Sequence, residues 1–195
     1  MKYCSECGAE VTLEVPSGDN RLRHICSQCK TIHYSNPKIV AGSLPVWKDR
    51  VLLCRRAIEP RHGLWTLPAG FMENDETAVE AAIRETEEEA GANIAIRDLY
   101  TMISLVHINQ VYLMFLADMK DKDFSAGEES LEVALFKEHE IPWDEIAFPV
   151  IAETLRLYYA DEKRGVFGTH IGEMNLVDAE QRTFESSFLN QADRT

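Results

Sequence analysis

The chain has 195 residues, 45% of them hydrophobic and 27% charged, which is the composition of an ordinary globular protein with one main core. Its 33 acidic and 20 basic residues give a formal net charge of -13, which argues against general nucleic-acid binding because Lys and Arg clusters supply phosphate contacts. No apolar run approaches the length of a membrane span and no charged-then-apolar leader opens the sequence, so we expect a cytoplasmic protein without a membrane partner.

Four of the five cysteines form two closely spaced pairs. Cys4 and Cys7 in "CSEC" and Cys26 and Cys29 in "CSQC" have the C-x2-C spacing of a four-thiolate zinc site. The alternative is two disulfides, but nothing else marks a secreted protein, and short C-x2-C loops suit a tetrahedral metal better. We therefore predict structural Zn2+ at these thiols, and expect Cys54 to be a small buried hydrophobe on an apolar strand.

Residues 1–34 are predicted to form this zinc module. The polar stretch 16–23 is expected to be the turn of a β-hairpin, and residues 35–38 are expected to be a linker. So short a module has almost no core of its own, so metal binding would supply its folding free energy.

The rest of the chain mixes strands and helices. Two apolar runs within residues 39–58 predict a strand pair around a polar turn, and a loop rich in Pro and Gly follows at 59–70. Further along we expect a helix at about 76–90 that ends at Gly91, two strands within 99–119, a strand within 131–142 and a helix at about 149–163. Residues 172–195 are expected to be a loosely docked tail. Strands adjacent in sequence favour an α/β fold with a mixed sheet covered by helices.

A cluster of acids in "RETEEEAG" dominates the first predicted helix. At about 100° per residue, Glu85, Glu88 and Glu89 share one face, whereas Glu87 points away and is expected to be solvated. The same projection predicts an apolar stripe that faces the core, made of Val79, Ala82, Ile83 and Ala90. Three like charges on one helix face repel one another.

Divalent cations would relieve this repulsion. Carboxylates at this density suit Mg2+ or Mn2+, which usually share such a site with substrate phosphate. Arg84, one turn before Glu88, can hydrogen-bond the carboxylates and fix their orientation. The alternative for an arbitrary run of acids is a charged surface helix.

The residues around the cluster carry a longer pattern. Gly70, Glu76 and the run 84–92 follow G-x5-E-x7-R-E-U-x-E-E-x-G-U, where U is a bulky apolar residue, and so resemble the signature of the Nudix hydrolases. Every charged and glycine position agrees, and Thr86 and Ala92 depart only at apolar positions. The resemblance implies a Nudix α/β/α sandwich with a mixed sheet over residues 38–171, preceded by the zinc ribbon. It also implies hydrolysis of a nucleoside diphosphate linked to another group.

The resemblance also implies roles for the residues that match it. Glu85 and Glu89 would be metal ligands, and Glu88 would be a ligand or would orient the attacking water. Arg84 would anchor the glutamates, and Gly70 would permit a backbone bend before the helix.

A second segment extends the resemblance. "GEESLEVALFKEHEIP" is similar to a stretch of zinc-ribbon Nudix pyrophosphatases in which an acid seven residues before a strand aromatic adds a metal ligand. That acid is Glu129, with Phe136 as the aromatic. Glu128 and Glu132 are rivals for this role, and a solvated loop acid is the alternative for each of them.

Substrate contacts are expected from residues just before the glutamates. Arg55, Arg56 and Arg61 are candidates to grip a diphosphate, although an exposed arginine at a strand end is more often solvated. Trp47 or Trp65 could stack on a base or flavin ring, with a structural plug as the alternative for Trp65.

Taken whole, the motifs are most similar to Nudix proteins that hydrolyse FAD and ADP-ribose to AMP plus FMN or ribose 5-phosphate. The similarity to NADH pyrophosphatases is weaker, because the "SQPWPFP" signature is missing after the glutamates. A non-catalytic, nucleotide-sensing binding protein is disfavoured by the intact glutamates, and removal of RNA caps should require a basic groove. We further expect a homodimer.

Overall fold

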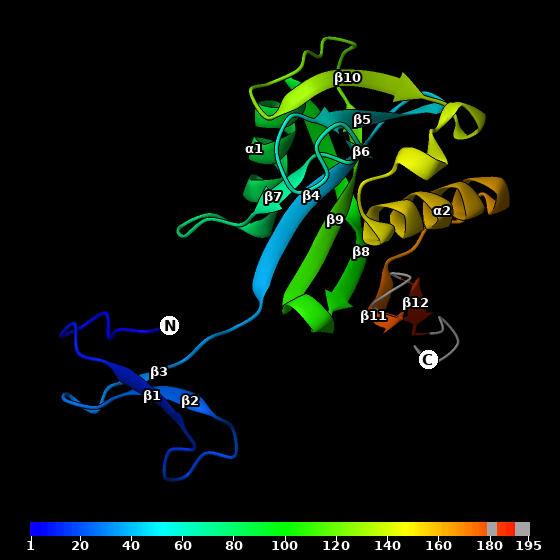
Figure 1. The fold of residues 1–195 in the computed structure, drawn as a ribbon. Coiled ribbons are helices and arrows are strands. Elements are labelled where there is room, and N and C mark those ends of the chain that lie inside the picture. Colours follow the sequence, from blue (N-terminus) through cyan, green and yellow to red (C-terminus); the bar gives the residue numbers. More distant parts are fainter. Residues whose placement is uncertain (179–182, 190–195) are drawn as a thin grey trace. The chain divides into compact units, whose positions relative to one another are not determined.

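A computed structural model describes residues 1–178 and 183–189, and the chain divides into two units, Met1–Pro37 and Lys38–Thr195 (Figure 1). The first unit holds a three-stranded sheet, β1 (Val11–Glu14), β2 (Arg23–Cys26) and β3 (Ile32–His33), in which neighbours are antiparallel. The predicted hairpin turn at 16–23 is confirmed by the pairing of β1 with β2. Only Cys4, Pro16 and Cys26 are buried among residues 1–37, so this unit lacks an apolar core.

The second unit is built on one mixed sheet. Its strands are β4 (Lys38–Trp47), β5 (Arg50–Arg56), β6 (Trp65–Thr66), β7 (Ala69–Phe71), β8 (Ile94–Leu105), β9 (Gln110–Met119), β10 (Ser130–Phe136), β11 (His170–Asp178) and β12 (Thr183–Phe188). They lie in the order β10-β5-β4-β9-β8-β11-β12, with β6 beside β5 and β7 beside β4. The predicted strand pairs β4–β5 and β8–β9 are antiparallel, whereas β4–β9 and β8–β11 are parallel. The loop predicted at 59–70 therefore contains β6 and the start of β7.

The sheet is covered by the helices α1 (Ala78–Ala90) and α2 (Pro149–Arg164) (Figure 1). Short 3-10 turns connect other elements: η1 (Val106–Ile108) joins β8 to β9, and η2 (Glu138–Glu140) and η3 (Trp143–Glu145) lie between β10 and α2. Alternate side chains of a strand point to opposite faces. In β5, Val51 and Leu53 join the core cluster that contains Ile151 of α2, whereas Leu52 and Cys54 join the cluster that contains Ala90 of α1. The helices thus lie on opposite faces, which confirms the predicted α/β/α sandwich. No helix in the described part of the chain is long and apolar enough to cross a membrane.

Helix α1 begins two residues later than predicted, because Thr77 caps it. The Thr77 hydroxyl accepts from the Glu80 backbone N–H at 3.2 Å, and the Glu80 carboxylate accepts from the Thr77 N–H at 2.7 Å, which is a capping box. The predicted stop at Gly91 is confirmed, since Gly91 has φ 57° and donates its N–H to the Glu87 carbonyl.

The predicted apolar stripe of α1 is partly wrong. Val79 and Ile83 are 39% and 37% exposed, whereas Ala81, Ala82, Thr86 and Ala90 are fully buried. The small alanines allow the helix to lie close to the sheet, and the larger side chains fall at the edge of the contact. At the apolar motif position, the Thr86 hydroxyl donates to the Ala82 carbonyl at 2.6 Å, so Ser43 supplies the hydrogen of the 2.6 Å Ser43–Thr86 bond.

The prediction of a loosely docked tail from residue 172 is also wrong for the residues the structure describes. Strand β11 extends the main sheet by pairing parallel with β8, and β12 pairs antiparallel with β11. The C-terminal end of α2 ties this hairpin down, because the buried Asp161 carboxylate bonds Tyr100 Oη at 3.0 Å and His170 Nε2 at 2.8 Å. Residues 179–182 and 190–195 of the predicted tail lie outside the described residues.

Candidate active site

One large cavity, of about 1020 Å³, lies in the second unit. Its wall contains glutamates of α1, the loop after β5, the start of α2 and parts of β9, β11 and β12. The charged side chains in this wall are Arg56, Glu59, Arg61, Glu73, Arg84, Glu85, Glu88, Glu89, Glu128 and Glu129. The structure therefore brings together most of the residues that the sequence singled out.

Gly70 makes room for a carboxylate in this wall. It lies in strand β7 and has no left-handed backbone, so the expected backbone bend is not its role. A Cβ atom at residue 70 would instead collide with all three terminal atoms of the Glu85 carboxylate. Only glycine lets the strand and the Glu85 side chain approach so closely.

Arg84 holds the carboxylates around it in place. Its guanidinium donates to Glu76 through two nitrogens, at 3.0 and 2.8 Å, to Glu85 at 2.7 Å and to Glu88 at 3.0 Å. It also donates to the Phe71 carbonyl at 3.3 Å, which ties the helix to the end of β7. The bond from Arg84 lowers the pKa of Glu76 to about 2, so this carboxylate is ionised at neutral pH.

Glu89 is the most deeply buried of the motif acids. It is 6% exposed, and its Oε2 accepts from the Ala69 backbone N–H at 3.2 Å. Burial raises the pKa of Glu89 to about 8, and the nearby charge of Glu85 adds to this rise. Burial also raises the pKa of Glu85, where Glu88 and Glu129 contribute. Both carboxylates thus lack enough positive charge around them in the free protein.

The remaining acids divide between the cavity and the solvent. Glu88 is exposed and lines the cavity beside Glu128 and Glu129. Glu129 is close enough to raise the pKa of Glu85 and Glu89, whereas Glu132 pairs with Arg55 at 3.7 Å outside the cavity wall. Glu87 is exposed and is absent from this wall.

Two of the three predicted arginines reach the cavity. Arg56 lies over the Phe148 ring at 5.1 Å and lowers the pKa of the buried Glu89 toward its usual value, although burial dominates there. Arg61 lies in the cavity wall with a left-handed backbone, φ 72°, which is uncommon for a residue with a side chain. Arg55 is not part of the wall, because its Nε donates to the Gly63 carbonyl at 2.9 Å.

The predicted stacking tryptophans do not line the cavity. Trp65 is 6% exposed and meets the Phe136 ring edge-on at 4.9 Å, so it is the structural plug that was its alternative, and Trp47 lies beside Lys48. The aromatic side chains that do line the cavity are Phe71, His107, Tyr112, Phe148 and Phe184. No local pattern distinguished them, since each comes from a different element.

The carboxylates fit a divalent cation by their chemistry rather than by a preformed cage. Among the described residues, the cysteines are the group whose ligand atoms all lie within 4.8 Å of one another, and the glutamates do not reach that spacing. Arg84 occupies oxygens of Glu85 and Glu88, and Glu89 has a backbone N–H as its bonded partner. A hard cation would supply the positive charge that the carboxylates of Glu85 and Glu89 lack.

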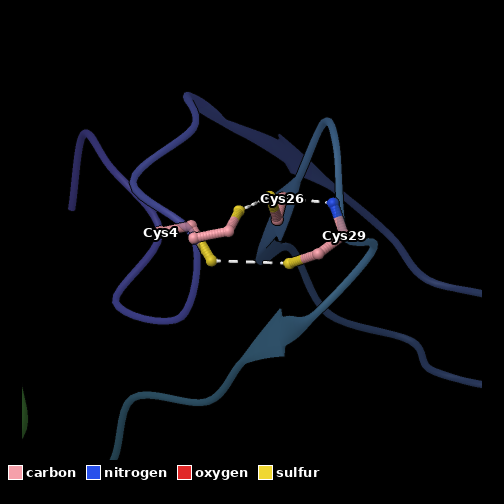
Figure 2. Close-up of side chains that lie close together, drawn as sticks. Cys4, Cys26 and Cys29 are labelled. Carbon is pink, nitrogen blue, oxygen red and sulfur yellow. Dashed lines mark hydrogen bonds between the residues drawn. The ribbon is translucent and has the colours of Figure 1, made fainter.

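The four cysteines of the first unit do form a preformed cluster (Figure 2). The Sγ atoms of Cys4 and Cys29 are 3.7 Å apart, and those of Cys7 and Cys26 are 3.4 Å apart. Four thiolates around one Zn2+ at about 2.3 Å would have sulfurs about 3.8 Å apart. The backbone N–H of Cys29 points at Cys26 Sγ at 3.3 Å, which stabilises a thiolate. The donor set therefore suits a closed tetrahedral site.

Comparison with known proteins agrees with both parts of the sequence pattern. The family described as "NUDIX domain" matches residues 37–157, and the family described as "Nudix N-terminal", a zinc ribbon, matches residues 2–35. The chain belongs to the Nudix hydrolase family. A NUDIX hydrolase from Nitrosomonas europaea is 55% identical, with a TM-score of 0.86, over 89% of this Nudix chain and 98% of that one.

Two curated relatives of this Nudix hydrolase carry different names. The NAD-capped RNA hydrolase NudC of Photobacterium profundum is 30% identical over 82% of this chain and 60% of its own length. The ADP-ribose pyrophosphatase of Methanocaldococcus jannaschii is 27% identical over 56% of this chain and 67% of its own length. The chain spans about 42–60% of the length of NudC relatives that it matches, so their activities are not simply transferred.

Proposed function

We propose that this chain is a Mg2+- or Mn2+-dependent pyrophosphohydrolase. Its substrate would be a nucleoside diphosphate linked to another group, such as ADP-ribose or FAD, and its products AMP plus ribose 5-phosphate or FMN. The observation that carries the proposal is that Glu85, Glu88, Glu89 and Glu129 line one cavity together with arginines. Membership of the Nudix family supports the reaction type.

The charges in the cavity suit hydrolysis of a phosphoanhydride. When bound, divalent cations supply the positive charge that a diphosphate and the glutamates both need. Glu85, Glu89 and Glu129 would hold the cations, and Arg84 would keep Glu85 and Glu88 oriented through its bonds of 2.7 and 3.0 Å. Arg56 at the end of β5 and Arg61 in the loop that follows it would contact the diphosphate.

Glu88 is the residue we assign to the attacking water. It is the exposed member of the motif trio, and Arg84 fixes one of its oxygens while the other is available to accept a proton. Water would add to one phosphorus, the bridging oxygen would leave with the other phosphate, and two phosphate monoesters would result. A positioned base of this kind typically contributes 10²- to 10⁴-fold to the rate.

The direct test is a Mg2+ titration with ADP-ribose, FAD, NADH and an NAD-capped oligonucleotide. Glu88→Gln should lose 10²- to 10⁴-fold in kcat. The matched control is Glu87→Gln, an isosteric change on the same helix at an exposed residue outside the cavity, and it should keep wild-type turnover. Equal turnover by wild type and Glu88→Gln, or no turnover of any dinucleotide, would refute the assignment.

The second candidate is cleavage of NADH or of an NAD cap on RNA, and the names of the curated relatives favour it. The cavity wall opposes a long RNA, since it holds seven glutamates against three arginines and the whole chain carries a net charge of -13. Turnover of the capped oligonucleotide that exceeds turnover of ADP-ribose and falls steeply with salt would favour the RNA substrate. Turnover of NADH without this salt dependence would favour the free dinucleotide.

The zinc ribbon is proposed to be structural. Four thiolates leave no open position on Zn2+, so the ion would stabilise residues 1–34 and take no part in hydrolysis. A purely nucleotide-sensing protein stays the non-catalytic alternative, and turnover of any substrate in the same panel would refute it. Homodimer formation and a cytoplasmic location stay predictions, and light scattering of the purified protein measures the first.

A further inference from the structure

The C-terminal hairpin lies beyond the Nudix family match and yet reaches the cavity. The match ends at residue 157, whereas Met174 of β11 and Phe184 of β12 are part of the cavity wall. In Figure 1 the hairpin, in orange and red, continues the sheet next to β8, as the pairing of β8 with β11 requires. Residues beyond the matched segment thus contribute part of the cavity wall.

The added wall differs chemically from the glutamate wall. Near the hairpin the cavity is lined by Leu105, His107, Ile108, Tyr112, Met174 and Phe184, which carry no carboxylate. His107 is exposed and Ile108 is 48% exposed, although both border the cavity. The cavity therefore has a part lined by charged side chains and a part lined mainly by apolar and aromatic side chains.

Phe184 is held in a defined orientation. Its ring centroid lies 5.6 Å from that of His107, at a tilt of 51°, and the side chain also packs against the main core cluster. A separation of 5.6 Å is a contact between two aromatic rings, so no third ring fits between them. A ligand ring would instead stack on the part of Phe184 that faces the cavity.

The two parts of the cavity wall belong to different regions of the sheet. The glutamates of α1 approach β7, which pairs with β4, while Phe184 is on β12. Strands β9, β8 and β11 lie between β4 and β12 in the sheet. A ligand that contacts both parts at once must therefore be elongated, as a dinucleotide is.

We propose that Phe184, supported by His107, forms a specificity subsite on which the planar heteroaromatic ring of the substrate stacks. This proposal rests on the proposed function, because the ligand would be the same nucleoside diphosphate derivative. It goes further in naming a residue outside the family match, and it gives the C-terminal hairpin a role in substrate choice. The ring could be adenine, flavin or nicotinamide, which share this stacking chemistry.

The test compares ligands with and without a ring, using monophosphates that need no cleavage. Calorimetry measures the dissociation constants of AMP, FMN, nicotinamide mononucleotide and ribose 5-phosphate. Phe184→Leu keeps apolar packing but removes the aromatic face. It should raise the dissociation constant of ring-bearing monophosphates about 5- to 100-fold, the range found for base–aromatic stacking. Ribose 5-phosphate binding should be unchanged, and Phe184→Tyr should restore ring binding to within about threefold.

The control is Phe188→Leu, which changes a partly buried phenylalanine on the same strand that is absent from the cavity wall. It should leave every dissociation constant unchanged. The proposal is overturned if Phe184→Leu binds all four ligands as wild type does, if it weakens ribose 5-phosphate as much as AMP, or if wild type shows no ring-dependent binding. Because binding is measured without turnover, loss of the subsite with normal hydrolysis, or the reverse, separates this proposal from the proposed function.

Discussion

Replacement of Glu89 by Gln should change how the stability of the free protein depends on pH. Glu89 is 6% exposed, and burial raises its pKa from 4.5 to about 8. When the folded pKa of a group lies above its unfolded value, the free energy of unfolding falls as pH rises between the two values. The reason is that the unfolded chain releases the proton, whereas the folded protein has to keep it to avoid a buried charge. A glutamine side chain in this place cannot ionise, so the Glu89→Gln variant should not show this loss.

The size of the effect follows from the two pKa values. Each tenfold step in proton concentration is worth about 1.4 kcal/mol. The pKa of Glu89 is about 8 in the folded protein and 4.5 in the unfolded chain. The free energy of unfolding of wild type should therefore fall by roughly 2.5 kcal/mol between pH 5 and pH 7, and that of Glu89→Gln should not. For a unit of this size that corresponds to a difference of roughly 5–10 °C in Tm.

Urea titrations of wild type, Glu89→Gln and Glu87→Gln in Mg2+-free buffer at several pH values would measure this difference. Glu87 is exposed on the same helix, so Glu87→Gln should follow wild type. Adding Mg2+ should stabilise wild type, since a ligand that binds the folded state shifts unfolding by mass action, and should stabilise Glu89→Gln much less. Parallel pH curves for wild type and Glu89→Gln would refute the reasoning.

Three further predictions concern other parts of the molecule. Gly70→Ala should keep a near wild-type Tm, because its Cβ meets the movable end of Glu85, but it should weaken Mg2+ activation about 10- to 100-fold. Gly42→Ala should lower Tm by about 2–12 °C, because its Cβ meets the Pro68 carbonyl and Ala69. Equal losses of Tm in the two variants would contradict this prediction. Asp161→Asn should cost about 3 kcal/mol or more in urea unfolding. Burial raises the pKa of Asp161, but the bonds from His170, Arg164 and Tyr100 lower it by more, so its net pKa is below the usual value. Wild type should therefore lose this stability as pH falls below about 4, whereas Asp161→Asn should not. The same loss of stability at acid pH in the variant would refute the role of the Asp161 carboxylate. Removal of zinc with a chelator should abolish the chemical-shift dispersion of the NMR amide signals of residues 1–37, while the signals of the second unit stay dispersed. Dispersed signals from residues 1–37 after chelation would show that the zinc ribbon folds without metal.

The elements that the sequence predicted well have strong local signals. The stop of α1 at Gly91 and the hairpin of β4 and β5 depend on residues within a few positions of each other, and local chemistry decides them. The cysteine spacing likewise brings four thiols together because each pair lies within one tight turn. Such features need no knowledge of the rest of the chain.

The features that were missed depend on contacts far apart in sequence. The predicted apolar stripe of α1 assumed that the largest side chains face the core. The close approach of the helix to the sheet instead buries small side chains such as Ala81 and Ala82, and Val79 stays exposed. Strand β11 has too few apolar residues to predict a strand by itself, and it is held by pairing with β8 and by the bond from His170 to Asp161. The aromatic wall of the cavity is assembled from separate elements for the same reason.

The glutamate cluster shows how the helix tolerates like charges. In the free protein the single charge of Arg84 is shared among Glu76, Glu85 and Glu88, so it offsets the charges of Glu85 and Glu88 only in part. Glu89 receives no such bond, and burial instead raises its pKa to about 8, which lets it hold a proton at neutral pH. Repulsion is thus relieved twice in the absence of metal, once by an arginine and once by a proton. Cation binding must displace that proton, so its apparent affinity should rise with pH until about pH 8 and level off above it. An affinity that is flat across this range would show that Glu89 is already ionised before the cation arrives.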